Sequence, residues 1–181
     1  MHRRRTGIDG RRRGRLKKEF ASGPDPEPIP YLDMHEVTAS ASAEDVWAAL
    51  PEALREAFDR PRARRFARLL ECHDQGSEGA FDAAPEETLA GFRVAAAEPP
   101  RRLALEGRHR FSRYRLTFEI EPAGAVSRLR AVTHAEFPGI RGALYRAAVI
   151  GGGGHRMITR RILNSIARRA ERIHSRRKEE Q

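Results

Sequence analysis

Cysteine and long apolar runs are scarce in this chain, and each scarcity excludes a class of protein. Cys72 is the single cysteine among 181 residues, so the sequence cannot form an internal disulfide and does not need an oxidising compartment. No apolar run reaches the roughly 18 residues that cross a bilayer, and the basic N-terminus is not followed by the apolar stretch of a signal peptide. We therefore expect a cytoplasmic protein without a membrane span.

The positive charge of the chain is concentrated at its two ends. The formal net charge is +10, of which residues 1–20 carry +7 and residues 155–181 carry +6, so that the 134 residues between them sum to −3. A nucleic-acid surface built into a folded domain would place the excess in the middle of the chain. We therefore expect contact with nucleic acid or another anionic surface only through the N-terminal arm.

The domain organisation follows from composition. Residues 1–30 combine arginine runs with glycine and with a proline-rich stretch that is too polar to bury a core. We interpret them as a disordered basic arm and a stiff linker. The folded domain is expected to span residues 31–175, and residues 176–181 are expected to form a charged tail.

Two short helices are predicted between a first strand at residues 31–38 and Pro61. The first helix begins at Ser42, an N-cap candidate with an acidic residue three positions later. Pro51 is expected to end or restart it, because proline cannot donate the backbone hydrogen bond of a helix interior. The second helix is expected over residues 52–58.

Apolar and charged residues alternate from Leu89 onward, after a segment at residues 62–88 whose period is not readable. Three successive segments, joined by short turns, each carry one apolar face and one charged face. These apolar faces run from Leu103 to Phe111, from Tyr114 to Ile120 and from Leu129 to Phe137. The pattern predicts an antiparallel meander with one wet face and one dry face that needs a cover.

A long amphipathic helix, from Gly142 to about Arg172, is predicted to provide that cover. Its apolar positions recur every three or four residues. They are Leu144, Ala148, Gly151, His155, Ile158, Ile162, Ile166 and Ile173. Strands followed by a long helix, with two short helices near the front, indicate an α+β fold.

Four consecutive glycines, Gly151 to Gly154, interrupt this helical pattern. Each costs a helix about 1 kcal/mol relative to alanine, so something must compensate or the helix must break. The glycines could open cavity volume, allow a strand to approach closely, or form a kink near a ligand entrance. A phosphate-binding loop is a weaker hypothesis, because no Lys-Ser or Lys-Thr pair follows.

Three local motifs accompany this order of elements. They are Ala41-Ser42-Ala43-Glu44-Asp45-Val46-Trp47, Phe92-Arg93-Val94 through Pro99-Pro100, and Phe137-Pro138-Gly139 followed by Gly142-Ala143-Leu144-Tyr145. With them, residues 31–172 resemble the START-like superfamily, also called SRPBCC or the polyketide cyclase and dehydrase-like group. The resemblance implies a helix-grip fold, in which a curved antiparallel sheet wraps a long C-terminal helix around a cavity. Members bind lipids, sterols, hormones or polyketides, and some catalyse cyclisation or dehydration, so the fold does not choose a function.

Eight residues are predicted to line the cavity, because they fall on the inner faces of the meander or of the helix. They are His109, Phe111, Tyr114, Leu116, Phe118, Thr133, Gly151 and His155. Four of them are polar, and a buried polar group without a partner costs on the order of 1–3 kcal/mol. Either these four orient a ligand, or backbone groups and water satisfy them within the core.

The leading hypothesis is a protein that binds a small apolar molecule of lipid or polyketide type. The first alternative is a cyclase-like or dehydratase-like enzyme acting on a carbonyl compound, with His109 or His155 as acid or base and Tyr114 as hydrogen-bond donor. The second alternative is an interaction module that docks through its basic arm. No set of ligands stands at a recognised metal spacing, so neither a metal nor a cofactor is expected.

Overall fold

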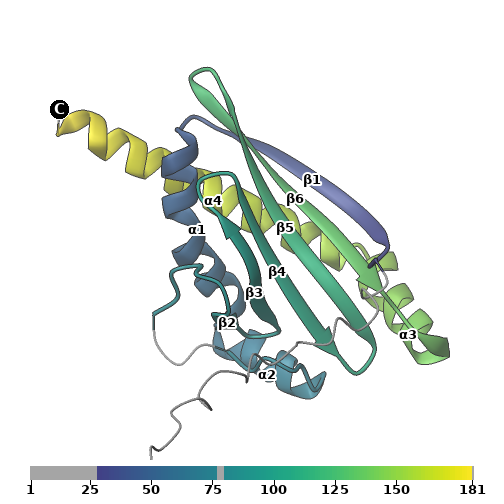
Figure 1. Ribbon diagram of the computed structural model, residues 1–181. Helices are drawn as coiled ribbons and strands as arrows, with labels where there is room; N and C mark the ends of the chain where they lie inside the picture. The colour runs from purple at the N-terminus through teal and green to yellow at the C-terminus, as the bar shows by residue number, and fades with distance from the viewer. Residues whose placement is uncertain (1–27, 77–79, 181) are drawn as a thin grey trace, which may run out of the picture.

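The computed structural model of this chain describes residues 28–76 and 80–180, and it has the predicted α+β architecture (Figure 1). Six strands form one antiparallel sheet in the order β1-β6-β5-β4-β3-β2. They are β1 (Tyr31–Ala39), β2 (Thr88–Leu89), β3 (Phe92–Glu98), β4 (Arg102–His109), β5 (Ser112–Ala123) and β6 (Val126–Glu136). The predicted meander is β4-β5-β6, and β1 pairs with its last strand.

Two long helices, α1 (Ala43–Phe58) and α4 (Gly154–Glu179), lie behind the sheet in Figure 1. Two shorter ones, α2 (Pro61–Leu69) and α3 (Gly139–Arg146), lie in the lower part of the molecule in that view, α2 near the middle and α3 at the right. The other face of the sheet is not covered by helices, which agrees with the charged residues of the alternating pattern. A sheet with one wet face and a C-terminal helix on its dry face is the predicted arrangement.

Helix α1 begins where the sequence predicts but does not stop at Pro51. The Ser42 hydroxyl accepts a hydrogen bond from the Asp45 backbone N–H at 3.1 Å, which caps the first turn. Pro51 lies inside the helix. Leu50 and Leu54 on either side of it are fully buried, so tertiary packing outweighs the cost of the missing hydrogen bond.

The second helix after β1 is therefore α2, not the predicted segment at residues 52–58. Pro61 is its first residue rather than the end of the pair. Proline is well suited to this position, because the first backbone N–H groups of a helix have no partner within the helix. The number of short helices was predicted correctly, and the division between them was misplaced by about ten residues.

The predicted single helix over residues 142–172 is divided into two helices. A π-helical turn, Ala147–Gly151, follows α3, and α4 starts only at Gly154. Between them Gly153 has a φ of +70°, a left-handed conformation that glycine adopts at little cost. The glycine run thus forms a break in the chain direction, which agrees with the kink hypothesis.

This break shifts the phase of the predicted apolar stripe. On the C-terminal side, Ile162 and Ile166 are buried, as predicted. On the N-terminal side, Leu144 is 67% exposed, and at the start of α4 Ile158 is 54% exposed. The break accounts for the exposure of Leu144, because a π turn and a left-handed residue rotate everything that precedes them. Ile158 lies within the continuous helix, and it is exposed where α4 borders a cavity.

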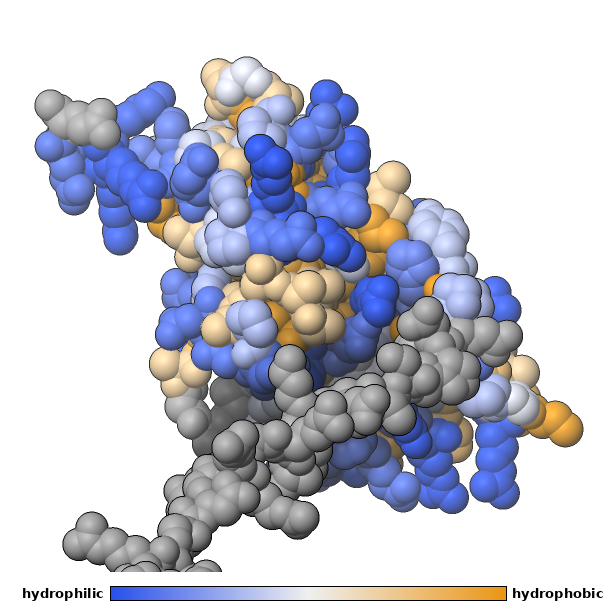
Figure 2. Space-filling model, in the orientation of Figure 1, coloured by the Kyte–Doolittle hydropathy of each residue, from blue (hydrophilic) through white to orange (hydrophobic). Residues whose placement is uncertain are grey.

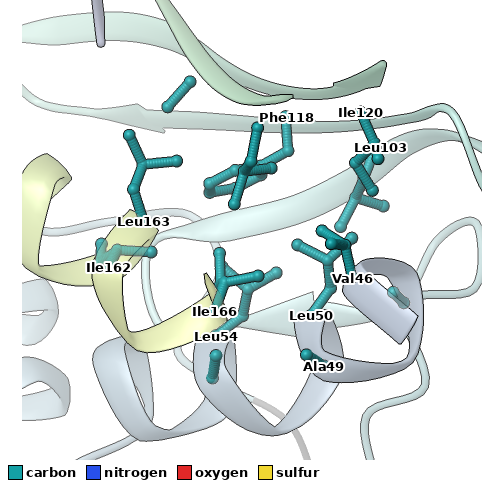
Figure 3. Close-up of a cluster of buried hydrophobic side chains, with 14 of the residues drawn as sticks. Val46, Ala49, Leu50, Leu54, Leu103, Phe118, Ile120, Ile162, Leu163 and Ile166 are labelled. Atoms are coloured by element: carbon teal, nitrogen blue, oxygen red, sulfur yellow. The ribbon is translucent and has the colours of Figure 1, made fainter. Parts of the chain in front are cut away.

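The core fills the space between α1, α4 and one half of the sheet (Figure 3). Its central ring is Phe118, which is fully buried and faces Leu163 and Ile166 of α4 as well as Leu50 and Leu54 of α1. Burying an apolar side chain of this size contributes roughly 1.5–3 kcal/mol. This cluster is the main source of stability that the structure shows.

The predicted ends of the domain meet different outcomes. Helix α4 runs through Glu179, so most of the predicted tail at residues 176–181 is helical. Residues 1–27 of the predicted arm and linker lie outside the described residues, and the arm stays a prediction. In the described part of the chain, no helix is long and apolar enough to cross a membrane.

Candidate functional site

The filled core ends part-way along the sheet, and a cavity of about 440 Å³ takes its place. On β5, Phe118 and Ile120 belong to the core, whereas Tyr114 and Ser112 line the cavity. Leu116 borders both regions. In chain order, β4 and β6 run from the packed core to the cavity, whereas β5 and α4 run from the cavity to the core.

Small residues at this end of the sheet keep the cavity open. Five alanines line it where larger side chains would fill it, and they are Ala57, Ala63, Ala67, Ala90 and Ala135. Gly107 is the inner neighbour of Tyr114 across the β4–β5 ladder. A Cβ on Gly107 would overlap the Tyr114 ring and the carbonyl oxygen of Gly91. Glycine at this position therefore lets the tyrosine ring lie across β4.

Tyr114 is held at the cavity wall by the backbone. Its hydroxyl donates a hydrogen bond to the carbonyl oxygen of Gly91 at 2.7 Å, and the Cys72 sulfur lies 4.0 Å from the same hydroxyl. Burial raises the pKa of Tyr114 far above its ordinary value of 10.0, and burial also raises the pKa of the Cys72 thiol. The phenol therefore stays protonated, and its hydrogen is used in the hydrogen bond to Gly91. Its oxygen remains available to accept a hydrogen bond from a ligand.

His109 is a neutral hydrogen-bond donor. Its Nδ1 accepts a hydrogen bond from the Phe111 backbone N–H at 3.1 Å, so the neutral ring carries its proton on Nε2. Burial lowers the pKa of His109, which favours this neutral form at neutral pH. The Tyr145 ring packs edge-on against the imidazole at a centroid distance of 4.9 Å. In this arrangement Nε2 can donate a proton to a hydrogen bond but has no lone pair to act as a base.

A second polar corner of the cavity joins β1, β6 and α4. His155 Nε2 lies 3.3 Å from the Thr133 hydroxyl and 3.2 Å from Asp33 Oδ1. The other Asp33 oxygen lies 3.3 Å from His35 Nε2, without a hydrogen bond between them. The first turn of α4 is thereby fixed to two strands at the edge of the cavity.

Five of the eight predicted site residues line this cavity, and they are His109, Tyr114, Leu116, Thr133 and His155. Phe118 instead lies in the filled core. Phe111 packs beside the small cluster around Leu70, with its ring stacked on Tyr145 at 5.8 Å. Gly151 is exposed in the π turn, with nothing within 4 Å of where its Cβ would be. Contact of any of these residues with a ligand stays a prediction.

Sequence reasoning missed several aromatic and sulfur side chains of the wall, namely Phe58, Phe66, Cys72, Phe92 and Tyr145. Phe66 belongs to the segment without a readable period, where arginines hide a short apolar stripe. Ala63, Phe66, Ala67 and Leu70 follow helical spacing, and that spacing was the available signal. The contribution of Tyr145 had no comparable signal, because it depends on how α3 is turned.

The site is an apolar chamber with two polar corners. One corner presents His109 Nε2–H and the Tyr114 oxygen, and the other presents Thr133 and His155. Over the residues that the structure describes, no three His, Cys, Asp or Glu side chains are grouped so that they could hold a metal ion. The chamber can enclose an apolar body and direct its polar atoms to fixed positions.

Sequence comparison identifies no relative of this chain: no protein family matches it, and no curated protein matches it. Solved structures do match. CalU16 from Micromonospora echinospora has a TM-score of 0.45 and 18% identity over 81% of this chain and 82% of that chain. A truncated norcoclaurine synthase from Thalictrum flavum has a TM-score of 0.46 and 12% identity over 78% of this chain and 96% of that chain.

A third match decides the fold together with the strand order. An uncharacterized protein from Rhizobium leguminosarum has a TM-score of 0.52 and 18% identity over 80% of this chain and 96% of that chain. The chain has the helix-grip fold, in which an antiparallel sheet packs on a long C-terminal helix. At this level of identity the helix-grip likeness concerns the fold, and the function has to be argued from the cavity itself.

Proposed function

We propose that this helix-grip protein binds a small, largely apolar molecule between its sheet and helices α2 and α4. The observation that carries the proposal is the cavity of about 440 Å³, lined mainly by alanine, leucine and aromatic side chains. Small-molecule sites commonly have volumes of roughly 300–1,000 Å³, apolar walls and a few placed polar groups. The cavity has each of these properties.

The polar corner at β4 and β5 supports a ligand with at least one acceptor atom. His109 Nε2–H is a hydrogen-bond donor, because the other ring nitrogen, Nδ1, already accepts a hydrogen bond from the Phe111 backbone. A carbonyl or ether oxygen would satisfy this donor, while the apolar body packs against Phe92 and Leu116. A ligand without any acceptor would leave the donor unpaired, which costs on the order of 1–3 kcal/mol.

Extraction of the purified full chain with organic solvent, followed by mass spectrometry, tests the proposal directly. We expect a co-purifying apolar molecule and displacement of an apolar fluorescent probe. Ala135→Phe should fill part of the cavity and abolish probe binding without loss of stability, because Ala135 lines the cavity. Ala48→Phe adds the same ring at an exposed position of α1 and is the matched control. Probe binding that Ala135→Phe leaves unchanged, with no extracted molecule, would overturn the proposal.

One observation favours a cyclase-like or dehydratase-like enzyme as the second candidate: His109, Tyr114 and His155 line the same cavity. In this alternative His109 polarises a carbonyl oxygen through Nε2–H, and His155 is the remaining base. The diagnostic reaction is exchange of the α-protons of an aromatic ketone with deuterium, followed by NMR. Exchange that is no faster with the wild-type protein than with His155→Gln would exclude this alternative.

A further inference from the structure

Two of the helical segments that border the cavity are rich in arginine and contain no acidic residue. Residues 60–70, which include α2, hold five arginines and no Asp or Glu. Residues 137–170, which include α3 and the first half of α4, hold seven arginines and no Asp or Glu. Side chains from α2, α3 and α4 all line the cavity, so these two segments frame one site.

Most of these arginines have no acidic partner. Nine of them are exposed and form no ion pair within the described part of the chain, and they are Arg62, Arg65, Arg68, Arg141, Arg146, Arg156, Arg160, Arg161 and Arg168. Most arginines on the wet face of the sheet differ from them. Arg93, Arg102, Arg115 and Arg130 each pair with at least one carboxylate, whereas Arg108 and Arg128 form no ion pair with the described residues. Unneutralised charge is therefore concentrated around the cavity.

Large apolar side chains are exposed on the same three helices. They are Phe66 (53%), Leu69 (78%), Ile140 (82%), Leu144 (67%), Met157 (50%) and Ile158 (54%). Phe66 and Ile158 also line the cavity, so the apolar surface continues from the interior to the outside. Figure 2 shows apolar side chains beside strongly hydrophilic ones at the end of the molecule where Figure 1 labels α3.

We propose that this mouth surface, formed by the exposed arginines and apolar side chains of α2, α3 and the first turns of α4, docks on an anionic lipid bilayer. Arginines attract anionic headgroups, while exposed leucine, isoleucine and phenylalanine enter the boundary between headgroups and acyl chains. Docked in this way, the cavity opens toward the lipid. The inference goes beyond ligand binding and holds whichever molecule the cavity takes.

The apolar component favours a bilayer over nucleic acid. A nucleic-acid backbone would neutralise the arginines but would leave Leu69, Ile140 and Leu144 in water. Proteins that bind single strands place aromatic side chains between their basic residues, and here Phe66 is the single exposed aromatic side chain of the mouth surface. Arginine interleaved with exposed aliphatic side chains is the composition of an interfacial membrane contact.

Vesicle flotation of the full chain tests this inference. The probes are vesicles of phosphatidylcholine alone and of phosphatidylcholine mixed with phosphatidylglycerol. We expect binding to the mixed vesicles and little binding to the neutral ones. The triple variant Arg65→Gln, Arg141→Gln, Arg146→Gln should weaken binding to the mixed vesicles about 100-fold, since each arginine near an anionic surface contributes about fivefold.

The matched control removes the same charge from other surfaces. Arg55→Gln, Arg128→Gln, Arg172→Gln changes three exposed arginines on α1, β6 and the later part of α4, for which no acidic partner exists within the described residues. Both triple variants keep the basic N-terminal arm, so any binding by the arm is equal in the two. We expect the control to lose less than about tenfold, through the general change in net charge. Equal losses in both variants would overturn the inference.

A charge-neutral variant separates a bilayer from nucleic acid. Leu69→Ser, Ile140→Ser, Leu144→Ser should reduce vesicle binding at least about tenfold, because it removes the inserted side chains. Met34→Ser changes an exposed apolar residue of β1 and should leave binding unchanged. Full vesicle binding by the serine variant, or binding of single-stranded RNA that only the arginine variant reduces, would overturn the inference. All substituted positions are exposed, so circular dichroism should show native folding in every variant.

Discussion

The two ends of the sheet are built from the same strands but serve different purposes. At the filled end, α1 and α4 press leucine and isoleucine side chains against Phe118, and that ring is fully buried. At the hollow end the same strands carry smaller or polar inner residues, such as Thr133 and Ala135, and a cavity lies beneath α2 and the start of α4. The filled end thus supplies the packed core, and the hollow end supplies the cavity to which the proposed ligand would bind.

The charges of the molecule follow the same division. Away from the cavity, ion pairs tie elements together, as in the pairing of Arg169 with Glu52 and Glu56 between α4 and α1. Around the cavity the exposed arginines of the mouth surface have no acidic partner among the described residues. Paired charges add little to stability when exposed, whereas unpaired charges of one sign attract a partner of the opposite sign. The hollow end therefore has the charge distribution expected of a surface that attracts an anionic partner.

Truncation of one core residue at each end should give the largest contrast. Phe118→Ala removes a fully buried ring at the filled end and should lower the free energy of unfolding by about 3–5 kcal/mol. Leu116→Ala removes a side chain that already borders the cavity, and should cost about 2 kcal/mol. Urea denaturation measures both, and a probe-binding titration of the folded fraction should change only for Leu116→Ala.

Either of two results would contradict this division. The first is an equal cost for the two truncations, which would mean that Leu116 is as tightly packed as Phe118. The second is altered probe affinity in Phe118→Ala at a concentration where the variant is fully folded. Either result would show that the filled and hollow ends form one cooperative packing unit.

Gly107 should be the most sensitive backbone position of the hollow end. Gly107→Ala forces a methyl group against the Gly91 carbonyl and the Tyr114 ring, so we expect a loss of about 2–3 kcal/mol. Gly151→Ala is the matched control, because a Cβ there has nothing within 4 Å and its φ is not positive. That change should leave the thermal midpoint equal to or slightly above wild type. A tolerated Gly107→Ala would mean that the Gly91 backbone and the Tyr114 ring can both move away from β4.

The sheet was predictable from the sequence because its pattern is local. Leu103, Leu105 and the alternating residues of the next two strands show a period of two that only a half-buried strand satisfies. Turn residues between the strands then set the antiparallel order. The α+β class needed one further observation, the helical period near Ile162 and Ile166, and that period holds in the structure.

Which strand residues face a cavity was not predictable by the same means. Tyr114 and Phe118 lie on the same face of β5, four residues apart, and the alternating pattern predicts the same inward orientation for both. They differ because α4 covers Phe118. Helix α4 begins only after the break at Gly153, close to the hollow end, where Tyr114 lies. Periodicity records which face is inside, and it does not record how far the covering helix extends.

Asp45 should contribute a pH-dependent clamp at the filled end. Its carboxylate, 2% exposed, lies 2.8 Å from His174 Nδ1 and 2.7 Å from Arg177 Nη1, so it joins α1 to the end of α4. The contact between Arg177 and Asp45 Oδ1 is an ion pair without a hydrogen bond. Burial alone would raise the pKa of Asp45, but the His174 and Ser42 hydrogen bonds and the Arg177 charge outweigh it and lower the pKa below 3.8.

Asp45→Asn should therefore lower the free energy of unfolding by about 1.5–2 kcal/mol at neutral pH. Because folding lowers this pKa, the wild-type carboxylate stabilises fully above its unfolded value and loses its contribution as the pH falls below 3.8. The difference between wild type and variant, measured by denaturant titration from pH 7 to pH 3, should shrink at the acid end. A constant difference would show that shape, and not charge, holds the clamp. Glu44→Gln, an exposed carboxylate one residue earlier, is the control.

The smallest expected effect tests the charge difference between the two ends. Arg102→Gln breaks an exposed ion pair with Glu98 at 3.0 Å and should lower the free energy of unfolding by no more than about 0.5 kcal/mol. Arg65→Gln removes an exposed arginine of α2 that has no acidic partner within the described residues, so its stability should stay unchanged or rise slightly as repulsion among neighbouring arginines falls. Thermal melts at low and high salt measure both, and salt should narrow the gap between the variants. If Arg65→Gln were the more damaging change, the arginines of the mouth surface would have a structural role, and the contrast between paired and unpaired charge would no longer separate stability from binding.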